Sequence, residues 1–426
     1  MRRFVQYLIV IAGLGYFSSA YSQDTLSLQY LLKSMQQNNA LYKVSSATDS
    51  VYTLRKSNIK VNYLPKVDFN AEATWQSDVT SIDIPIPNID IPSLDKDSYK
   101  ITVDVNQLIW DGGTTSAKLK SEESSRILEQ NKVDNELYNL KDKVISLYFG
   151  VASVDIAIQQ LAIMQNELNS RISELQAGVK AGAVLESSLI SLQAEKLRIG
   201  QSIESNNAQR ASLVESITAL TGVNIDGLSN FKLPQLQLPD DRQCNRPDYK
   251  MFDLQQSYFE STSNLASRKR YPVLLAFAKA GYGKPGLNML SSEFDTYAIV
   301  GAKLSWNIWD WNSTSRERQN IKIQQSITNY RRDAFNDTYS AQLKSSMAQI
   351  NSLKSQINSD EQIVSLLEKS VAVSSSQLKN GTITSATYLS DFNSLLRARI
   401  DMNLRRVKLS QEVVKLYFEI GKDIND

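Results

Sequence analysis

The chain has 426 residues, with 47 lysines and arginines against 45 aspartates and glutamates, no histidine and one cysteine, Cys244. The lack of histidine excludes a histidine general base, a Ser-His or Cys-His nucleophile pair and imidazole metal ligation. We find no glycine-rich phosphate loop, metal-spaced acidic cluster, nucleophile motif or basic footprint for nucleic acid. The sequence therefore predicts a protein that is not an enzyme, holds no cofactor or metal, and binds no nucleic acid.

Residues 1–22 have the pattern of a secretory signal peptide. Two arginines precede an apolar run over 4–14, which is too short to span a membrane, and small residues follow up to Ser22. Removal of this segment takes away two of the 47 basic residues, so the mature chain has 45 charges of each sign. We expect an exported protein that begins at Gln23 and is stable without an internal disulfide.

The mature sequence consists of one unit repeated, with a first repeat at 23–223, a linker at 224–247 and a second repeat at 248–426. A shift of 199 residues places the Trp-Asp pair at Trp110 on that at Trp309, and Gly182 on Gly381. The first copy has a surplus that falls at 81–97, where closely spaced prolines predict a loop. Prolines among polar residues mark the linker in the same way.

Four segments are predicted as strands, at about 66–76, 98–108, 273–282 and 297–308. Apolar and polar residues alternate along them, most strictly from Val67 to Gln76 and less cleanly in 273–282. Such strands can bury one face in lipid and wet the other, although a half-exposed sheet in a soluble protein has the same pattern. The tryptophans favour the membrane, because all of them lie in or next to these segments and indole prefers the membrane interface. This expected interface belt consists of Trp75, Trp110, Trp306, Trp309 and Trp311.

An open sheet of four strands cannot stand in hydrocarbon, because every backbone N–H and C=O there must be paired. Several chains must therefore pool their strands. Two chains give eight strands, whose interior is filled by side chains, whereas three give twelve and leave a lumen. A conduit fits a homotrimer better.

Long helical hairpins are predicted at 113–221 and 312–421. Apolar residues recur in heptads from Val133 onward, and each pattern stops at a glycine, Gly182 or Gly381, before a returning amphipathic run. A transmembrane helix at 144–164 is the competing interpretation, but Asp155 and two glutamines would be costly in lipid. The first hairpin follows Trp110-Asp111-Gly112-Gly113, while the second follows Trp309-Asp310-Trp311-Asn312, so we expect its turn to differ.

The signal peptide, the doubled strand-strand-hairpin unit, Leu64-Pro65 before the first strand, the Ile-Trp-Asp-Gly-Gly junction and the two hairpin glycines together resemble the TolC outer-membrane efflux family. This resemblance covers essentially all of the mature chain. It implies a mixed fold, in which a trimeric 12-stranded membrane β-barrel continues into a long α-helical coiled-coil barrel in the periplasm. It also implies that the protein lies among outer-membrane lipid and meets a periplasmic adaptor (membrane fusion protein) and an inner-membrane pump.

In the resembling family the second-copy tip carries acidic residues and an arginine that constrict the pore. The matching positions here are Thr387, Ser390 and Ile383, counted from Gly381, and Asp391 lies one residue from an expected acid. A polar, uncharged constriction and a substitution by Asp391 are both open. The tip expected to contact the adaptor comprises Gly182, Val184, Leu185, Ser187 and Ser188, with helix packing as the alternative role of Val184 and Leu185.

The sequence thus predicts a passive channel-tunnel that serves as the exit duct of a tripartite efflux or type I secretion system, gated at its hairpin tips. One alternative is a periplasmic coiled-coil adaptor or structural spacer, which would share the hairpins but not the tryptophan-bounded strands. A hydrolase that uses two carboxylates is a further alternative, for which no constellation is present. The cargo, and the choice between efflux and secretion, stay open.

Overall fold

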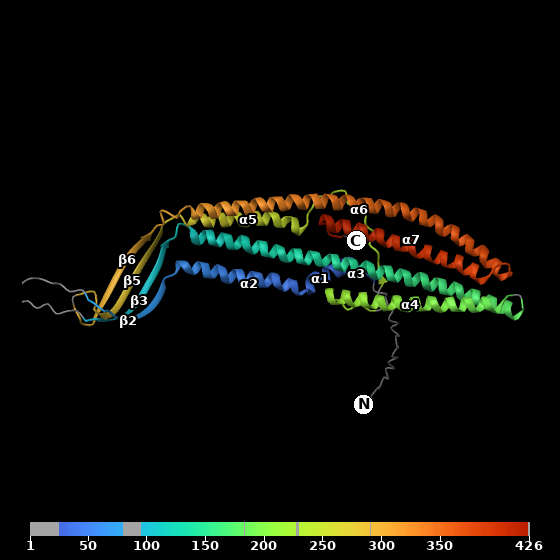
Figure 1. Cartoon of the computed structure of the whole chain (residues 1–426), viewed down its shortest axis with the longest axis horizontal. Coiled ribbons are helices and arrows are strands. Elements are labelled where there is room, and N and C mark those ends of the chain that lie inside the picture. The colour runs from blue at the N-terminus through green and yellow to red at the C-terminus, as the bar shows by residue number, and fades with distance from the viewer. Residues whose placement is uncertain (1–24, 80–94, 183, 227–229, 290, 425–426) are drawn as a thin grey trace, which may run out of the picture.

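The structure is a computed structural model that describes residues 25–79, 95–182, 184–226, 230–289 and 291–424. The signal peptide expected at 1–22 and most of the loop expected at 81–97 lie outside these residues and stay predictions. Figure 1 shows an elongated molecule with its strands at one end and two long helical hairpins that reach the other. Strand end and hairpin tips are therefore as far apart as the molecule allows.

Both repeats contain a helix, two strands, a long helix and a shorter returning helix in that order, and the first repeat adds α1 and η1. The first contains α1 (Leu28–Asn38), α2 (Ala40–Lys60), the 3-10 turn η1 (Val61–Tyr63), β2 (Lys66–Trp75), β3 (Asp97–Trp110), α3 (Thr114–Lys180) and α4 (Glu186–Thr221). The second contains α5 (Pro247–Arg268), β5 (Val273–Lys284), β6 (Asp295–Ser305), α6 (Ser313–Lys379) and α7 (Ser385–Ile420). Both α3 and α6 have 67 residues, and both α4 and α7 have 36, which supports an internal duplication.

The linker meets the N-terminal segment near the middle of the long helices. β1 (Thr25–Leu26) pairs in parallel with β4 (Asn230–Phe231), which lies inside the linker. Beneath this pair, α1, α3, α4 and the end of α7 share a core that includes the fully buried Leu31, Val144, Tyr148 and Ile217. Tyr148 donates its hydroxyl hydrogen to the carbonyl of Leu26 at 2.9 Å. This core fixes the two hairpins side by side at their midpoint.

Within the described residues one helix, α3, contains a window long and apolar enough to cross a membrane by length and composition. The window belongs to a helix that packs along much of its length on α4, α5 and α7. Its residues Val144, Tyr148 and Val151 are fully buried in the central core. Burial among other helices accounts for part of the apolar character, because 39% of the window is buried.

The last strand is shorter than the sequence predicts. The expected strand ran over 297–308, but β6 begins at Asp295 and ends at Ser305. Ser305 pairs with Val273, the first residue of β5, and the chain before Val273 turns back into α5. Among the described residues of a single chain, 306–308 lie beyond the start of β5 and have no strand to pair with.

Candidate membrane sheet and hairpin tips

The four long strands form one antiparallel sheet in the order β2-β3-β5-β6. Directly opposed residues lie on the same face, and the register brings apolar residues opposite apolar ones across all four strands. Val67 faces Val105, Phe69 faces Val103, and Val103 in turn faces Ala280. The resulting apolar face consists of Val67, Phe69, Ala71, Ala73, Tyr99, Ile101, Val103, Val105, Ala276, Ala278, Ala280, Ala298, Val300, Ala302 and Leu304. Phe69 and Val300 on this face are 69% and 82% exposed, so most of the face is open, while Phe294 covers one end of it by stacking on Tyr99 and Tyr282.

The opposite face carries charged and polar side chains. Asp104 on β3 accepts hydrogen bonds from Asn70 (2.6 Å) and Thr102 (3.0 Å) and forms an ion pair with Lys279 on β5 at 3.1 Å. A cavity of about 720 Å³ lies over this network. Leu287 and Met289, from the segment after β5, line the cavity on its other side. The sheet therefore has one apolar and one polar face, as the alternation of its sequence predicts.

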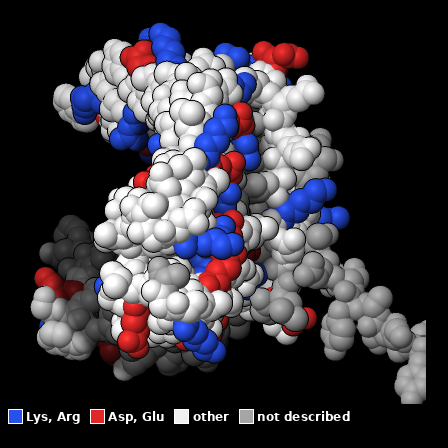
Figure 2. All heavy atoms as spheres, turned by 90° about the vertical axis from the view of Figure 1, so that its right-hand side faces the viewer, with Lys and Arg blue, Asp and Glu red and all other residues white. Residues whose placement is uncertain are grey.

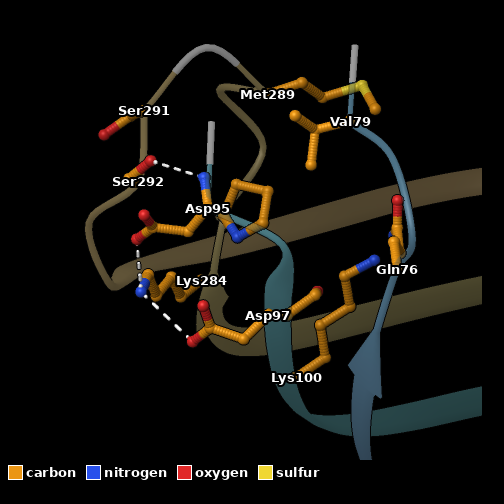
Figure 3. Close-up of a pocket in the computed structure, with 11 residues that line it drawn as sticks. Gln76, Val79, Asp95, Asp97, Lys100, Lys284, Met289, Ser291 and Ser292 are labelled. Atoms are coloured by element: carbon orange, nitrogen blue, oxygen red, sulfur yellow. Dashed lines mark hydrogen bonds and ion pairs between the residues drawn. The ribbon is translucent and has the colours of Figure 1, made fainter. Parts of the chain in front are cut away.

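Charged residues also join the two repeats at the free end of the sheet. Lys284, the last residue of β5, forms ion pairs with Asp95 at 2.6 Å, just before β3, and with Asp97 at 3.3 Å, the first residue of β3 (Figure 3). The Asp95 amide donates to the hydroxyl of Ser292 at 3.3 Å. These residues line a cavity of about 180 Å³ between the two connecting segments, with Met289 at its rim. The sequence analysis did not single out this cluster, because its members are nearly 200 positions apart.

The tryptophans lie at the two ends of the sheet. Trp75 ends β2 beside the connecting segments and is 73% exposed, whereas the other four lie where the strands meet the helices. Exposures there are 46% for Trp110, 56% for Trp306, 70% for Trp309 and 76% for Trp311. This distribution is what two interface belts would require, although the role of each ring as a belt residue stays a prediction.

An aspartate caps the long helix of each repeat directly after the sheet. Asp111 accepts the N–H groups of Gly113 (2.9 Å) and Thr115 (2.6 Å), and Asp310 accepts that of Thr314 (2.9 Å). Burial favours a higher pKa for Asp111, but these hydrogen bonds outweigh it and hold the pKa below its ordinary value. The hydrogen bond from Thr314 lowers the pKa of Asp310 as well. Both aspartates therefore act as charged caps at helix N-termini.

The turn after the second aspartate does not differ as we expected. Gly112 and Gly113 have φ of 66° and 81°, and Trp311 and Asn312 have φ of 52° and 59°, so both copies use two left-handed residues. A Cβ on Gly112 would lie 2.3 Å from Cβ of Tyr271, which requires glycine there. The side chain of Trp311 instead points into the open, so a bulky residue fits at the cost of backbone strain.

At the second-copy tip, Gly381 has φ of 70° and α7 begins after Thr384. Thr384 caps α7 by accepting the N–H of Thr387 at 3.3 Å, and Thr387 and Ser390 are exposed. Ile383 packs against the buried cluster below the tips. Asp391 accepts a hydrogen bond from Ser370 of α6 at 3.2 Å, which holds it toward its own hairpin. Figure 2 looks at this end and shows charges of both signs interspersed among wide uncharged areas.

At the first-copy tip, Gly182 has φ of 73° and the residues before α4 divide into packed and free positions. Val184 is half-buried and lies against Gly178, where an added Cβ would come within 3.0 Å of it. Ser188 is buried, whereas Leu185 is 74% exposed and Ser187 is exposed. Of the expected adaptor-contact residues, Leu185 and Ser187 are thus the side chains free to meet a partner.

Below the tips, α7 joins the second hairpin to the first. Tyr388 and Phe392 of α7 are buried in a cluster with Leu168 of α3 and Leu192 of α4. Arg399 of α7 forms ion pairs with Glu368 of α6 at 2.7 Å and with Glu167 of α3 at 3.3 Å. The sequence analysis missed Arg399 and its two partners, since nothing in a heptad pattern marks which polar position faces another hairpin.

A family model described as outer membrane efflux protein matches residues 238–422, nearly all of the second repeat. No curated protein sequence matches the chain significantly. The fold is similar to that of several solved outer-membrane proteins. The Vibrio cholerae protein VceC is 14% identical over 93% of this chain and 97% of its own, with a TM-score of 0.67.

Two further solved structures share the fold. The Campylobacter jejuni outer membrane channel CmeC is 13% identical over 92% of this chain and 85% of its own, with a TM-score of 0.67. The Neisseria gonorrhoeae outer membrane channel MtrE, solved in an open state, is 13% identical over 93% of this chain and 89% of its own, with a TM-score of 0.68. The family match over the second repeat and the fold over the whole chain together confirm the resemblance to the TolC-type outer membrane efflux family that is seen in the sequence.

Proposed function

We propose that three copies of this protein form a passive channel-tunnel that serves as the exit duct of a tripartite efflux or type I secretion system. The single observation that carries the proposal is the two-faced sheet with open edges. Its apolar face is exposed, its other face is polar, and the structure describes no strand beyond β2 or β6. Such a sheet can stand in a bilayer only if other chains pair its edges. Three chains give a closed barrel with a lumen.

The internal repeat predicts how neighbouring chains pair. Val103 on β3 faces Ala280 on β5. The offset of 199 residues carries Val103 to Ala302 on β6, and a second offset of 207 residues, which places Pro65 on Pro272, carries Ala280 back to Ala73 on β2. Ala73 of one copy and Ala302 of the next should therefore be opposite each other, both on the apolar face. The same transfer takes Val105 and Ala278 to Leu304 and Ala71, again on that face. The closure thus keeps lipid-facing residues together.

The length of the helices supports a route across the periplasm. At about 1.5 Å per residue, the 67 residues of α3 extend for roughly 100 Å, much more than the thickness of a bilayer. In the proposed trimer the hairpins surround a water-filled tunnel and their tips point to the inner membrane. A pump there would supply the energy, and a periplasmic adaptor would hold duct and pump together, with no chemistry on the cargo.

We place the gate at the second-copy tips, around Gly381, Ile383, Thr387, Ser390 and Asp391. Because Thr387 and Ser390 are uncharged and Asp391 bonds to its own hairpin, the constriction is polar rather than acidic. Opening would move α6 and α7 away from the first hairpin. The adaptor would meet the first-copy tip through Leu185 and Ser187, next to Gly182, Val184 and Ser188.

The edge pairing gives a direct test of the assembly. In a Cys244→Ser background, Ala73→Cys and Ala302→Cys in one chain should produce covalent dimers and trimers in outer membranes after mild oxidation. Ala73→Cys with Lys303→Cys is the matched control, because Lys303 lies on the opposite face of β6. Exclusively monomeric protein with the first pair would refute the shared barrel and favour the periplasmic spacer.

The gate has its own test. Cysteines introduced next to Gly381 and bridged across subunits should abolish export while the trimer still assembles. Export that continues at the unbridged rate would refute a gate at these tips.

A further inference from the structure

We propose that a pocket at the end of the sheet where β6 leads into α6 binds the headgroup of an anionic phospholipid in the periplasmic leaflet. This inference rests on the proposed function, because it requires the sheet to stand in the outer membrane. The pocket has a volume of about 350 Å³ and lies between the end of β6 and the start of α6. Its lining includes Arg270, Trp306, Ile308, Trp309 and Trp311.

The apolar part of the pocket is built for a membrane interface. Ile308 is 78% exposed, and the indoles of Trp309 and Trp311 meet edge to face with ring centres 5.7 Å apart. The indole N–H of Trp306 donates to the carbonyl of Arg270 at 3.0 Å, which holds the ring against the turn that carries the arginine. Rings so fixed and so exposed can lie among acyl chains and headgroups at low conformational cost.

The backbone at the pocket is strained in a way that a binding role explains. Trp311 keeps φ at 52°, a left-handed conformation that is unfavourable for a residue other than glycine. The first repeat has Gly112 at this position, and Tyr271 fills the space where a side chain would stand. Only the second copy, therefore, has both the opening and the indole. Strain of this kind is typical of functional positions.

Two arginines at the pocket outnumber its one carboxylate, Asp310, which also lines the pocket and attracts Arg270. Arg270 is exposed, as is Arg316, which lies one helical turn after Asn312 of the pocket. Neither arginine has a carboxylate within 4.0 Å among the described residues. The nearby acids are engaged: Asp310 accepts the Thr314 N–H at 2.9 Å, and Glu317 pairs with Lys269 at 2.7 Å. Arg270 beside the exposed indoles, with Arg316 one helical turn away, gives the pocket the positive charge that suits a phosphate diester attached to acyl chains.

Tryptophan fluorescence offers a test in the complete mature chain. With Trp75→Phe and Trp110→Phe, the remaining emission comes from the three indoles of the pocket. The protein is reconstituted in phosphatidylcholine vesicles in which a growing fraction is replaced by brominated phosphatidylglycerol or, separately, brominated phosphatidylcholine. We expect the anionic quencher to act at a several-fold lower mole fraction than the zwitterionic one.

Arg270→Gln should reduce this preference by about fivefold, the effect of one basic residue at an anionic surface. Arg331→Gln is the matched control, since Arg331 is an exposed arginine of α6 that lies about five helical turns beyond Asn312 of the pocket. Equal quenching by the two lipids, or equal effects of the two substitutions, would overturn the phospholipid site alone. Failure of brominated phosphatidylcholine to quench at all would instead refute the membrane placement on which the proposed function depends.

Discussion

Replacement of Arg399 by glutamine should shift the duct toward its open state. Arg399 links α7 both to Glu368 of its own hairpin, at 2.7 Å, and to Glu167 of the first hairpin, at 3.3 Å. If opening moves the second hairpin away from the first, the contact with Glu167 breaks while that with Glu368 survives. The substitution removes a contact that only the closed state keeps, so it destabilises the closed state relative to the open one.

The magnitude follows from the exposure of the pair. The side chains of Arg399 and Glu167 are 20% and 43% exposed, so their interaction is partly screened and contributes about 0.2–1 kcal/mol. If three chains open together, the closed state loses about 0.6–3 kcal/mol. This loss multiplies the open-to-closed ratio by a factor between roughly three and roughly one hundred. Single-channel recording in planar bilayers measures this ratio as the fraction of time spent at high conductance.

Arg406→Gln is the matched control for this prediction. Arg406 lies on the same helix and pairs with Glu361 at 2.7 Å, but this partner belongs to its own hairpin. Arg406→Gln should therefore leave the open fraction unchanged. Equal open fractions for the two variants would refute the idea that the second hairpin separates from the first at this point, as would a more closed Arg399→Gln channel.

Three further predictions concern stability, measured as the thermal unfolding temperature of the mature protein in detergent. Gly112→Ala should lower the unfolding temperature clearly, because the left-handed backbone costs alanine about 1–2 kcal/mol and the new Cβ would lie 2.3 Å from Cβ of Tyr271. Trp311→Gly should leave the unfolding temperature equal or higher. A larger loss from Trp311→Gly than from Gly112→Ala would contradict this account. Asp111→Asn should lower the unfolding temperature near neutral pH. Folding lowers the pKa of Asp111, so its stabilisation of the folded protein is full above the unfolded pKa of about 4 and disappears as the pH falls through the folded pKa. The unfolding temperatures of wild type and variant should therefore converge in acid. A difference between them that persists in acid would argue against a charged cap. Arg246→Ala should lower the free energy of unfolding by about 2 kcal/mol or more, since the guanidinium forms an ion pair with Asp248 at 2.6 Å and lies over three aromatic rings from different helices. An unchanged unfolding temperature would disprove the structural role of Arg246.

Periodicity in the sequence was enough to predict the two faces of the sheet. The alternation from Val67 to Trp75 assigns each side chain to one side, and the register of the structure then places like beside like. The equal lengths of the paired helices likewise agree with the repeat offsets. These features depend on local patterns that extend over many residues, so individual exceptions do not obscure them.

Features that depend on single contacts between distant segments could not be predicted. Arg399 and Glu167 are 232 positions apart, and no spacing rule connects them. Lys284 and Asp95 meet because the two connecting segments of the sheet fold toward each other. The turn at Trp311 misled us for a different reason: glycine is the usual left-handed residue, and here the surroundings impose that conformation on a tryptophan.

The register of the sheet also bears on how such a chain could have arisen. The seam between β3 and β5 joins the two repeats within one polypeptide, and the proposed seam between β6 and the neighbour's β2 uses the corresponding positions. A half-length ancestor would then have needed only this one kind of seam to close a ring of six. Fusion of two such units left the wall unchanged while it freed the second copy to acquire features of its own, such as an indole where the first copy must keep a glycine.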